Sequence, residues 1–423
     1  MSETVRIAVA GLGTVGATVA KRLLEGAVSG AELVAVSARD AARDRGVNLS
    51  AQRFETDPLN LIADDVDIVV ELMGGEGGAA LALVEAALRA GKPVVTANKA
   101  MLAAHADRLS DLSVGGNVPL AFEAAVAGGI PVIKTVRESM AGNRIERLSG
   151  ILNGTCNYIL SRMEAAGLSF ADALKEAQDL GYAEADPFLD VSGTDAGQKL
   201  AILSALAHGV APNMDNVAIT GIEQISAQDI AFADQFGSVI RLVAMAERRG
   251  NGVFHRVMPM LVRKSETLAT VTNELNALSI AAQPVGQIFL QGPGAGGGAT
   301  ASAVLGDIAD ITHGFGRPLF AKATSQMTES ATDSAPDSEF YIRVALADKP
   351  GSMAKATQIL AENGVSIEEV VQRSSPTGDS YLPVVFITHQ CAASAVKAAL
   401  TAFEGQSEFC DAVLALPVYA DNA

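Results

Sequence analysis

The chain has 423 residues and a formal net charge of −17 at pH 7, and 49% of its residues are hydrophobic. The length predicts two or three domains, and a composition rich in Ala, Val, Gly and Leu is typical of α/β proteins. The negative charge argues against partners such as nucleic acid or an anionic membrane, and no apolar run reaches the about 18 residues of a membrane span.

Cysteine and histidine usage excludes further classes. Cys156, Cys391 and Cys410 are scattered and form no disulfide framework or zinc motif, and the five histidines are scattered as well. The first residues read as a strand rather than as a signal peptide. These features predict a protein of the reducing cytoplasm.

The N-terminal strand at 5–10 leads into Gly11-Leu12-Gly13-Thr14-Val15-Gly16, and a helix is predicted from Thr14 to about Leu24. This is a GxGxxG motif in the strand–turn–helix context that dinucleotide binding requires. The first glycine allows the tight turn, the second lets a pyrophosphate approach, and the third lets the helix pack closely. We predict cofactor contacts at Gly11, Gly13, Thr14, Val15 and Gly16; a glycine-rich turn without nucleotide is the alternative.

The strand at 33–36 ends in Ser37-Ala38-Arg39 instead of the acidic residue that holds the ribose hydroxyls of NAD. Arg39 is suited to a 2′-phosphate, so NADP is favoured over NAD. Alternatively, Arg39 is an exposed cation neutralised by Asp40.

Strands at 67–72 and 93–96 end in Met73-Gly74-Gly75 and Ala97-Asn98-Lys99. Ligands bind at this edge of a parallel sheet, so Gly74 and Lys99 are candidate cofactor or substrate contacts. A strand at 119–122 precedes Glu123 and a small-residue turn up to Pro131. A carboxylate with backbone carbonyls suits a monovalent cation, although an ordinary hinge between domains explains the spacing better.

The segment from Gly181 to Lys199, GYAEADPFLDVSGTDAGQK, is dense in carboxylates. Asp195 and Lys199 share one face of a helix predicted to begin near Thr194, which places an acid beside a base. A solvated acidic loop followed by a surface ion pair is the alternative. Nearby, Asn153 to Tyr158 open another helix, in which Cys156 is expected to be packed rather than nucleophilic. Finally, the glycine-rich loop 292–298 precedes a helix at about 300–311 and is either cofactor-binding or flexible.

Together these motifs resemble homoserine dehydrogenase. The resemblance covers about residues 5–320, and the departures are Cys156, where the family often has Thr, and Gly77-Gly78, where Glu-Pro is common. It is carried by GLGTVG (11–16), VVELMGG (69–75), VVTANKAML (94–102), FEAAVAGGIP (122–131), NGTCNYIL (153–160), LGYAEADP (180–187), DVSGTDAGQKL (190–200) and GPGAGGGATASAV (292–304).

The resemblance implies NAD(P)-dependent interconversion of L-homoserine and L-aspartate 4-semialdehyde, with Lys199 as the acid–base group. It implies Lys99 near the reacting oxygen and the nicotinamide, and a substrate pocket made by Glu184, Asp190, Asp195, Tyr182, Gly154 and Thr155. It also implies nucleotide contacts at Arg39, Lys99, Gly292 and Gly294, and a Na⁺ site at Glu123, Val126, Gly128 and Ile130. Two other functions stay open: a dehydrogenase for another small amino-aldehyde, and an inactive NADP-binding sensor.

Residues 321–338 are small and polar and read as a linker. The pattern after it predicts strands and helices in the order βαββαβ, with the turn Asp348-Lys349-Pro350-Gly351-Ser352-Met353 opening the first helix. This looks like an ACT domain, which implies binding of an amino acid, expected to be L-threonine, at Asp348, Gly351, Ser352 and Met353. A purely structural dimerisation module is the alternative.

The predicted fold class is therefore α/β with a Rossmann-type domain, an α+β domain and a ferredoxin-like ACT domain. We assign 1–130 to nucleotide binding, with the helix at 300–320 packed back on it, and 131–320 to catalysis and dimerisation. The linker is 321–338, the ACT domain is 339–423, and a homodimer or homotetramer is expected.

Overall fold

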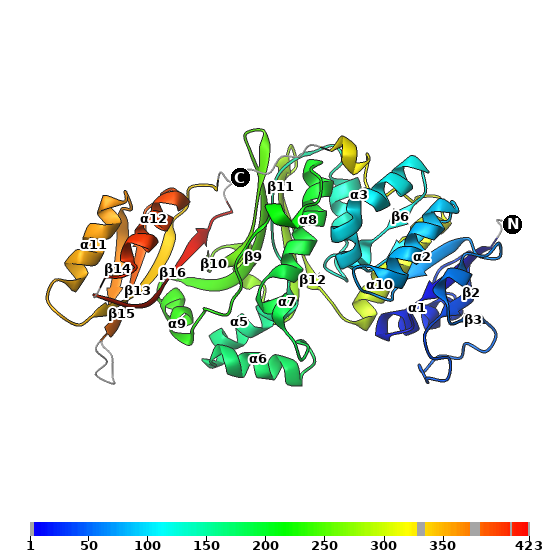
Figure 1. Cartoon of the computed structure of the whole chain (residues 1–423), viewed down its shortest axis with the longest axis horizontal. Coiled ribbons are helices and arrows are strands. Elements are labelled where there is room, and N and C mark those ends of the chain that lie inside the picture. Colours follow the sequence, from blue (N-terminus) through cyan, green and yellow to red (C-terminus); the bar gives the residue numbers. More distant parts are fainter. Residues whose placement is uncertain (1–3, 328–334, 373–380, 407, 422–423) are drawn as a thin grey trace.

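The structure is a computed structural model that describes residues 4–327, 335–372, 381–406 and 408–421. The molecule is elongated, with an N-terminal α/β part, a central part built on a long antiparallel sheet, and a C-terminal part in a row (Figure 1). Within the described residues, no helix has the length and apolar character needed to cross a membrane.

The N-terminal sheet is parallel, with strand order β3-β2-β1-β4-β5-β6, as the sequence motifs predict for a dinucleotide-binding fold. Short apolar segments form its central strands because both faces of the sheet are covered by helices. The strands are β1 (Val5–Ala10), β2 (Ala31–Ser37), β3 (Arg53–Glu55), β4 (Ile68–Glu71), β5 (Val94–Thr96) and β6 (Leu120–Ala121).

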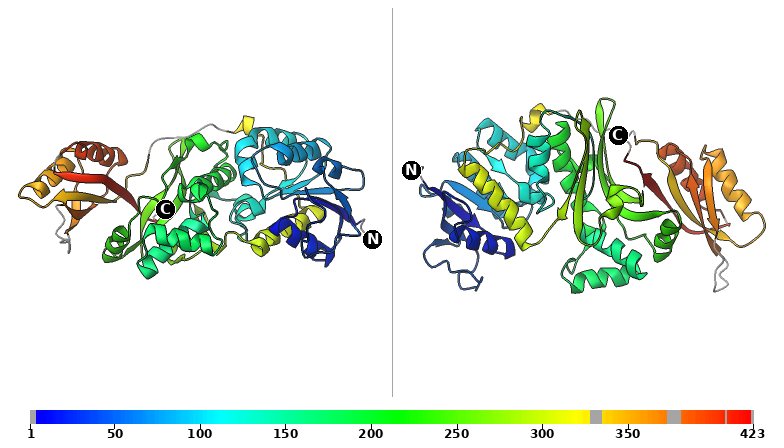
Figure 2. Two further views of the ribbon diagram at one scale, coloured as in Figure 1. Left: turned by 60° about the horizontal axis from the view of Figure 1, so that its bottom comes forward. Right: turned by 180° about the vertical axis from the view of Figure 1, so that it is seen from behind.

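Alternate residues of β1 enter different cores, since successive strand side chains point to opposite faces. Ile7 and Val9 pack with α1 (Thr14–Leu24) and α10 (Gly297–Thr312), whereas Ala8 and Ala10 belong to the core that holds α2 (Gly78–Arg89) and α3 (Lys99–Gly115). The structure thus places α10, which is distant in sequence, directly against α1 (Figure 2).

The central part is an antiparallel sheet with helices on one face. Its strands β7 (Arg144–Ile151), β9 (Ser238–Arg249), β10 (Gly252–Arg263), β11 (Leu275–Gln283) and β12 (Gly286–Pro293) follow the order β12-β11-β7-β9-β10. The short β8 (Ala218–Ile219) pairs with β10. The helices are α4 (Val132–Lys134), α5 (Gly154–Ala166), α6 (Phe170–Asp179), α7 (Phe188–Val191), α8 (Thr194–His208) and α9 (Ala227–Gln235).

The C-terminal part has the predicted βαββαβ order. It consists of β13 (Phe340–Ala347), α11 (Ser352–Glu362), β14 (Ile367–Gln372), β15 (Tyr381–Thr388), α12 (Ala393–Phe403) and β16 (Phe409–Tyr419). Within the stretch predicted as a linker, Thr324–Gln326 is a 3-10 turn, and residues 328–334 lie outside the described residues.

One strand joins the last two parts of the molecule. β16 pairs antiparallel with β13 and, through Val418 and Tyr419, parallel with Leu261 and Val262 of β10. The sheet of the C-terminal part therefore continues the central sheet, a connection that the sequence pattern did not predict (Figure 1). Buried Asp229 of α9 strengthens the join, because it accepts hydrogen bonds from the Tyr341 hydroxyl at 2.8 Å and Arg343 Nε at 2.7 Å.

Candidate active site

The two lysines singled out in the sequence meet at one carboxylate. Lys99 is the first residue of α3, and Asp195 and Lys199 lie one turn apart on α8. Asp195 Oδ2 accepts from Lys199 Nζ at 2.8 Å, and Asp195 Oδ1 lies 3.2 Å from Lys99 Nζ. The helix pairing predicted at i,i+4 is thus present, and a cation from the nucleotide-binding part completes it.

Charge balance at this cluster favours the ionised carboxylate. Burial raises the pKa of Asp195, but the positive charges of Lys199 and then Lys99 outweigh it and bring the pKa down to about 2. Lys199 is nearly buried, with 11% of its side chain exposed, whereas Lys99 is 36% exposed. The cluster therefore holds one fixed ammonium group inside and a second one at its edge.

Asn153 organises the carboxylates around this cluster. Its Nδ2 donates to Asp190 Oδ1 at 2.7 Å and to Asp195 Oδ2 at 2.8 Å, while its Oδ1 caps α5 by accepting from the Cys156 amide. Burial is the main cause that raises the pKa of Asp190. Cys156 is fully buried, burial raises its thiol pKa well above the usual value, and it donates to the Asp190 carbonyl. It is a packed residue, as expected.

The Leu152 carbonyl connects Lys199, through Asn276, to the glycine-rich loop 292–298. It accepts from Lys199 Nζ at 2.7 Å and from Asn276 Nδ2 at 3.0 Å. Asn276 in turn lies so close to Gly294 that a Cβ there would fall 2.1 Å from its side chain. A side chain at 294 would therefore displace the group that holds the Lys199 acceptor in place.

The acidic loop before α7 is placed beside this cluster but points partly to solvent. Thr155 donates to the Tyr182 carbonyl at 2.9 Å, and the Tyr182 ring packs on Tyr158 with centroids 4.8 Å apart. Glu184 is exposed, and no hydrogen bond or ion pair within the described residues joins its carboxylate to the lysine cluster. Gly154 packs against the Glu274 carbonyl at the start of α5.

The nucleotide loop has the expected geometry. Gly11 has φ +92° and lies against the backbone of Leu72, and Gly16 lies against the Gly11 carbonyl, so neither position has room for a side chain. Around Gly13, by contrast, a Cβ would meet no heavy atom within 4 Å. The start of α1, with its unpaired amides, thus faces open space that a pyrophosphate can occupy.

The two glycine-rich segments that were predicted separately come together here. Gly297, at the start of α10, lies against Thr14, and Gly128 lies against the Gly294 carbonyl. Two helix starts, those of α1 and α10, therefore border the same space. Gly74, across the sheet, is held by Glu71, which is buried and accepts from the amides of Met73 and Gly74.

Arg39 is exposed and forms no hydrogen bond or ion pair within the described part of the chain. The Asp40 carboxylate accepts from the Ala42 amide instead, at 2.9 Å. Arg39 is thus an exposed cation, as in the alternative weighed from the sequence, but no ion pair with Asp40 forms within the described residues.

The predicted cation position centres on a buried carboxylate. Glu123 is 3% exposed, and its two oxygens accept from the amides of Ile133 and Lys134 at 2.7 and 2.9 Å. Burial, followed by the charge of Asp307, raises the pKa of Glu123 to about 7. Nearby, Ala127 and Gly128 both have positive φ. Within the described residues, no group of three or more His, Cys, Asp or Glu side chains could hold a metal ion.

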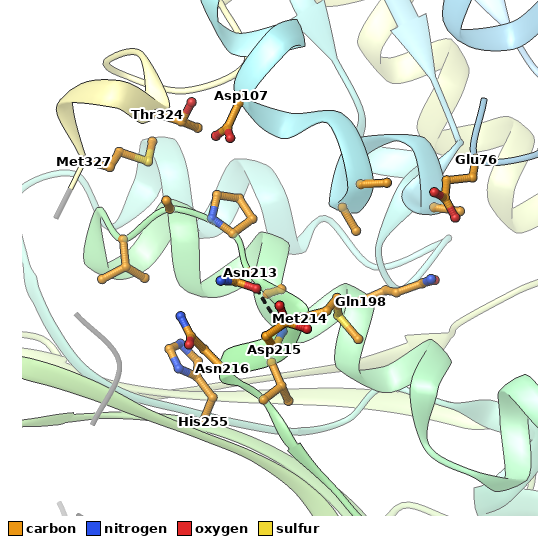
Figure 3. Close-up of a pocket in the computed structure, with 18 of the residues that line it drawn as sticks. Glu76, Asp107, Gln198, Asn213, Met214, Asp215, Asn216, His255, Thr324 and Met327 are labelled. Atoms are coloured by element: carbon orange, nitrogen blue, oxygen red, sulfur yellow. Dashed lines mark hydrogen bonds between the residues drawn. The ribbon is translucent and has the colours of Figure 1, made fainter. Parts of the chain in front are cut away.

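A cavity of about 1020 Å³ lies between α3 and α8 (Figure 3). Neither Lys99 nor Lys199 lines it. Its walls carry Glu76, Asp107, Asp111 and Asp215, and no lysine or arginine among the described residues lines it. None of residues 11–16 lines the cavity, so it is distinct from the nucleotide loop, and its negative wall disfavours a dinucleotide.

Comparison with known proteins agrees with this geometry. Residues 11–123 match the family model "Homoserine dehydrogenase, NAD binding domain", 131–309 match "Homoserine dehydrogenase", and 340–405 match "ACT domain". The chain belongs to the homoserine dehydrogenase family. It is 39% identical to the homoserine dehydrogenase of Neisseria gonorrhoeae over 95% of each chain.

Solved structures show the same family. A homoserine dehydrogenase from Thiobacillus denitrificans is 36% identical, with a TM-score of 0.89 over 98% of each chain. A hyperthermophilic archaeal homoserine dehydrogenase in complex with NADPH is 29% identical, with a TM-score of 0.63 over 74% of this chain and 99% of that one. The protein is an oxidoreductase of this family that carries a nicotinamide-cofactor domain and a C-terminal ACT domain.

Sequence reasoning missed the residues that position the charged groups of this dehydrogenase. Asn153 bonds two carboxylates, Asn98 caps α3 and donates to the Gly75 carbonyl at 2.7 Å, and Asn276 holds Leu152. Asn98 and Asn153 each stand just before a helix, the position where asparagine caps, although a helix was predicted only after Asn153. Asn276 lies inside a strand and gave no such signal.

Proposed function

We propose that this homoserine dehydrogenase interconverts L-aspartate 4-semialdehyde and L-homoserine with Lys199 as the proton donor and acceptor. The observation that carries the role is the anchoring of Lys199. Lys199 Nζ donates two of its three N–H groups, one to Asp195 and one to the Leu152 carbonyl. These two fixed partners set the direction of the third N–H group. A held donor of this kind suits general acid–base catalysis better than a mobile surface lysine.

A bound nicotinamide supplies the hydride for reduction and takes it up in the reverse direction. When the aldehyde carbon gains the hydride, its C=O π electrons move to the oxygen. Lys199 gives that oxygen a proton and becomes a neutral amine, which solvent reprotonates. In the oxidation of homoserine, the neutral Lys199 takes the hydroxyl proton instead.

Lys99 is proposed to stabilise the developing oxyanion. It stands 36% exposed at the edge of the cluster, next to the strand ends that face the nucleotide loop. Asp195 keeps both ammonium groups in place and, because its pKa is about 2, stays ionised at every working pH. A positive charge fixed before the reaction lowers the barrier without reorganisation.

The substrate's ammonium and carboxylate ends need their own partners. We assign Glu184 and Asp190 to the ammonium group, and Tyr182, Gly154 and Thr155 to the walls of the same pocket. Asp190 lies next to the cluster through Asn153. The exposure of the Glu184 carboxylate leaves it free to receive an ammonium group from solvent.

NADP is the proposed cofactor, bound along Gly11, Gly13, Thr14, Val15 and Gly16. The unpaired guanidinium of Arg39 supports the preference, since a 2′-phosphate provides the anion that Asp40 does not. The loop at Gly292 and Gly294 would cover the other side, and Gly74 and Lys99 would face the nicotinamide end. The NADPH complex of the archaeal relative is consistent with this choice.

A Na⁺ ion is proposed beside Glu123, with backbone carbonyls of Val126, Gly128 and Ile130. Glu123 and Asp307 both have raised pKa values, about 7 and about 6, mainly because they are buried. A cation there would offset burial and favour the ionised carboxylate. Its role would be structural, holding the 126–130 turn that packs against Gly294.

Feedback regulation by L-threonine is proposed at the start of α11, at Asp348, Gly351, Ser352 and Met353. Gly351 caps the helix with φ +95°, and the buried Ser352 hydroxyl has no hydrogen-bond partner within the described residues. Both features suit a carboxylate at a helix start. Assembly as a homodimer or homotetramer stays a prediction, to be checked by light scattering.

One assay tests the whole proposal. The full chain is given L-aspartate 4-semialdehyde with NADPH or NADH, with and without millimolar L-threonine. We expect oxidation of NADPH, a slower rate with NADH, and inhibition by threonine. Turnover of a different amino-aldehyde with a higher kcat/KM would favour the other dehydrogenase, and NADPH binding without any turnover would favour the inactive sensor.

A further inference from the structure

A second cavity lies far from the lysine cluster, beside the strand that joins the central and C-terminal parts. Its volume is about 630 Å³, within the range of small-molecule sites. Its walls come from β9, β10, the segment before β13 and the end of β16. A molecule bound here would contact both sides of the join at once.

Four arginines line this cavity, and three of them already have a carboxylate. Arg147 pairs with Asp421 at 2.8 Å, Arg249 with Glu247 at 3.4 Å, and Arg263 with Glu339. These pairs neutralise most of the wall. The remaining arginine of the lining, Arg256, has no ion pair among the described residues.

Arg256 is 6% exposed, and within the described residues it forms no hydrogen bond and no ion pair. Its contact is the ring of Phe254, 5.5 Å from the guanidinium carbon. Burial lowers the pKa of Arg256 to about 10; the charge of Glu247 opposes this shift, and the charges of Arg147 and Arg249 add to it. A buried, charged guanidinium without an anion is costly, and structures rarely retain one without a partner.

The lining of the same cavity includes a carboxylate without a partner among the described residues. Asp337 is exposed at the rim, and its carboxylate has no hydrogen bond or ion pair within the part of the chain that is described. Glu247 and Glu339 also line the cavity. Both glutamates pair with arginines, so Asp337 is the lining carboxylate that remains available to attract an ammonium group.

We infer that this cavity, the junction pocket, binds a small zwitterionic amino acid whose carboxylate pairs with Arg256 and whose ammonium group faces Asp337. The planar guanidinium matches a carboxylate with two parallel hydrogen bonds. The site is separate from the α11 start proposed above and does not depend on it. It also does not depend on the acid–base role of Lys199.

The junction pocket is mechanically connected to the catalytic helix. Arg256 lies on β10, opposite Met245 of β9, and α8 packs on both strands. The same β10 pairs with β16 through Leu261 and Val262. An amino acid in the pocket would therefore stiffen the one strand that both the C-terminal part and the helix of Asp195 and Lys199 contact.

The test uses the full chain and calorimetric titration with L-threonine, L-methionine and L-lysine, each at saturating NADPH. We expect at least one of them to bind, and Arg256→Met to weaken that binding at least tenfold. Arg256→Lys should give an intermediate affinity, because it keeps the charge but loses the fork. Arg144→Met is the control, since Arg144 is an exposed arginine of the same sheet, 69% exposed and paired with Glu146.

Thermal melting without ligand separates binding from a structural role. Because Arg256 has no hydrogen-bond or ion-pair partner among the described residues, and methionine can still pack on the Phe254 ring, Arg256→Met should melt at the same or a higher temperature than the wild type, with unchanged turnover. A large loss of stability would mean that Arg256 supports the fold, and would overturn the inference.

Further results would overturn it. One is equal amino-acid affinity in wild type and Arg256→Met, with binding lost in Ser352→Ala, which would place the ligand at α11 alone. A second is Arg256-dependent binding of inorganic phosphate as tight as that of the amino acid. Absence of any amino-acid binding, with turnover intact, would also exclude the junction pocket while leaving the dehydrogenase proposal standing.

Discussion

Two buried carboxylates, those of Asp195 and Glu123, have pKa values shifted in opposite directions. Asp195 is 8% exposed and Glu123 is 3% exposed, and burial raises the pKa of each. At Asp195 two lysines reverse the effect, and the pKa falls to about 2. At Glu123 two backbone amides and the charge of Lys134, which also pairs with Asp307, do not suffice, and the pKa rises to about 7.

The difference distinguishes a site whose charges the chain itself balances from a site that a bound ion would complete. The chain itself supplies the countercharges of Asp195, so that cluster is ready to act on a substrate oxygen. Glu123 shares its neighbouring cation, Lys134, with Asp307 and Asp310, which fits the proposed Na⁺ ion.

The largest effect is expected from Lys199→Ala. Loss of the proton donor should lower kcat/KM for the semialdehyde by about 10³-fold, in the range of general acid–base catalysis. NADPH affinity, measured by fluorescence titration, should stay within twofold. Lys175→Ala is the control, since this exposed lysine pairs only with Asp179 on α6. Activity near that of the wild type would remove Lys199 from the mechanism.

Asp195→Asn should destabilise the fold in a way that depends on pH. The native pKa of about 2 lies below the ordinary value of 3.8, so the carboxylate stabilises the protein above pH 3.8. This stability is lost as the pH falls towards 2. We expect the variant to unfold with about 2–3 kcal/mol less free energy at pH 7, measured in urea, and the deficit to vanish near pH 2. A deficit that does not change with pH would contradict the ion-pair explanation.

Glu123→Gln should act in the opposite sense. A carboxyl whose pKa is raised from 4.5 to about 7 makes the folded state lose stability as the pH rises through that interval, by at most about 3 kcal/mol. The variant should therefore show a flatter dependence of melting temperature on pH between 5 and 8. In the wild type, NaCl but not choline chloride should restore stability at pH 8. Equal effects of the two salts would exclude a specific cation.

Arg39→Ala should give the smallest effect and tests a cation without a protein partner. Loss of a charged hydrogen bond to the 2′-phosphate should raise the KM for NADPH about tenfold and leave that for NADH unchanged. Arg22→Ala, which removes an exposed arginine paired with Glu25 on α1, is the control. Equal preference for NADPH in wild type and variant would show that Arg39 does not select the cofactor.

The sequence predicted those parts of the molecule whose signals are local. The loop at Gly11, the i,i+4 pair of Asp195 and Lys199, and the order of elements in the C-terminal part follow from glycine spacing and periodicity. Lys99 was placed correctly at a strand end, but its contact with Asp195 depends on how two distant helices meet. No pattern within one helix encodes such a contact.

Other features depend on tertiary structure in the same way. Nothing around Asn276 indicates that it holds the Leu152 carbonyl, because the partner lies on another element and the bond forms only when β11 pairs with β7. Likewise, Arg256 reads as one of several charged residues in a strand. Its isolation appears only when the carboxylates around it are seen to be taken by other arginines.

The pairing of β10 with β16 also determines which part of the molecule separates first in local unfolding. Its two registered pairs connect residues far apart along the chain, whereas β9 and β10 pair along their whole length. Contacts of such large sequence separation form late in folding and contribute few protected amides. In native-state hydrogen exchange, the C-terminal part should thus separate as its own cooperative unit, at a free energy below that of global unfolding. The enzyme would then fluctuate between joined and parted forms while its catalytic helix stays folded.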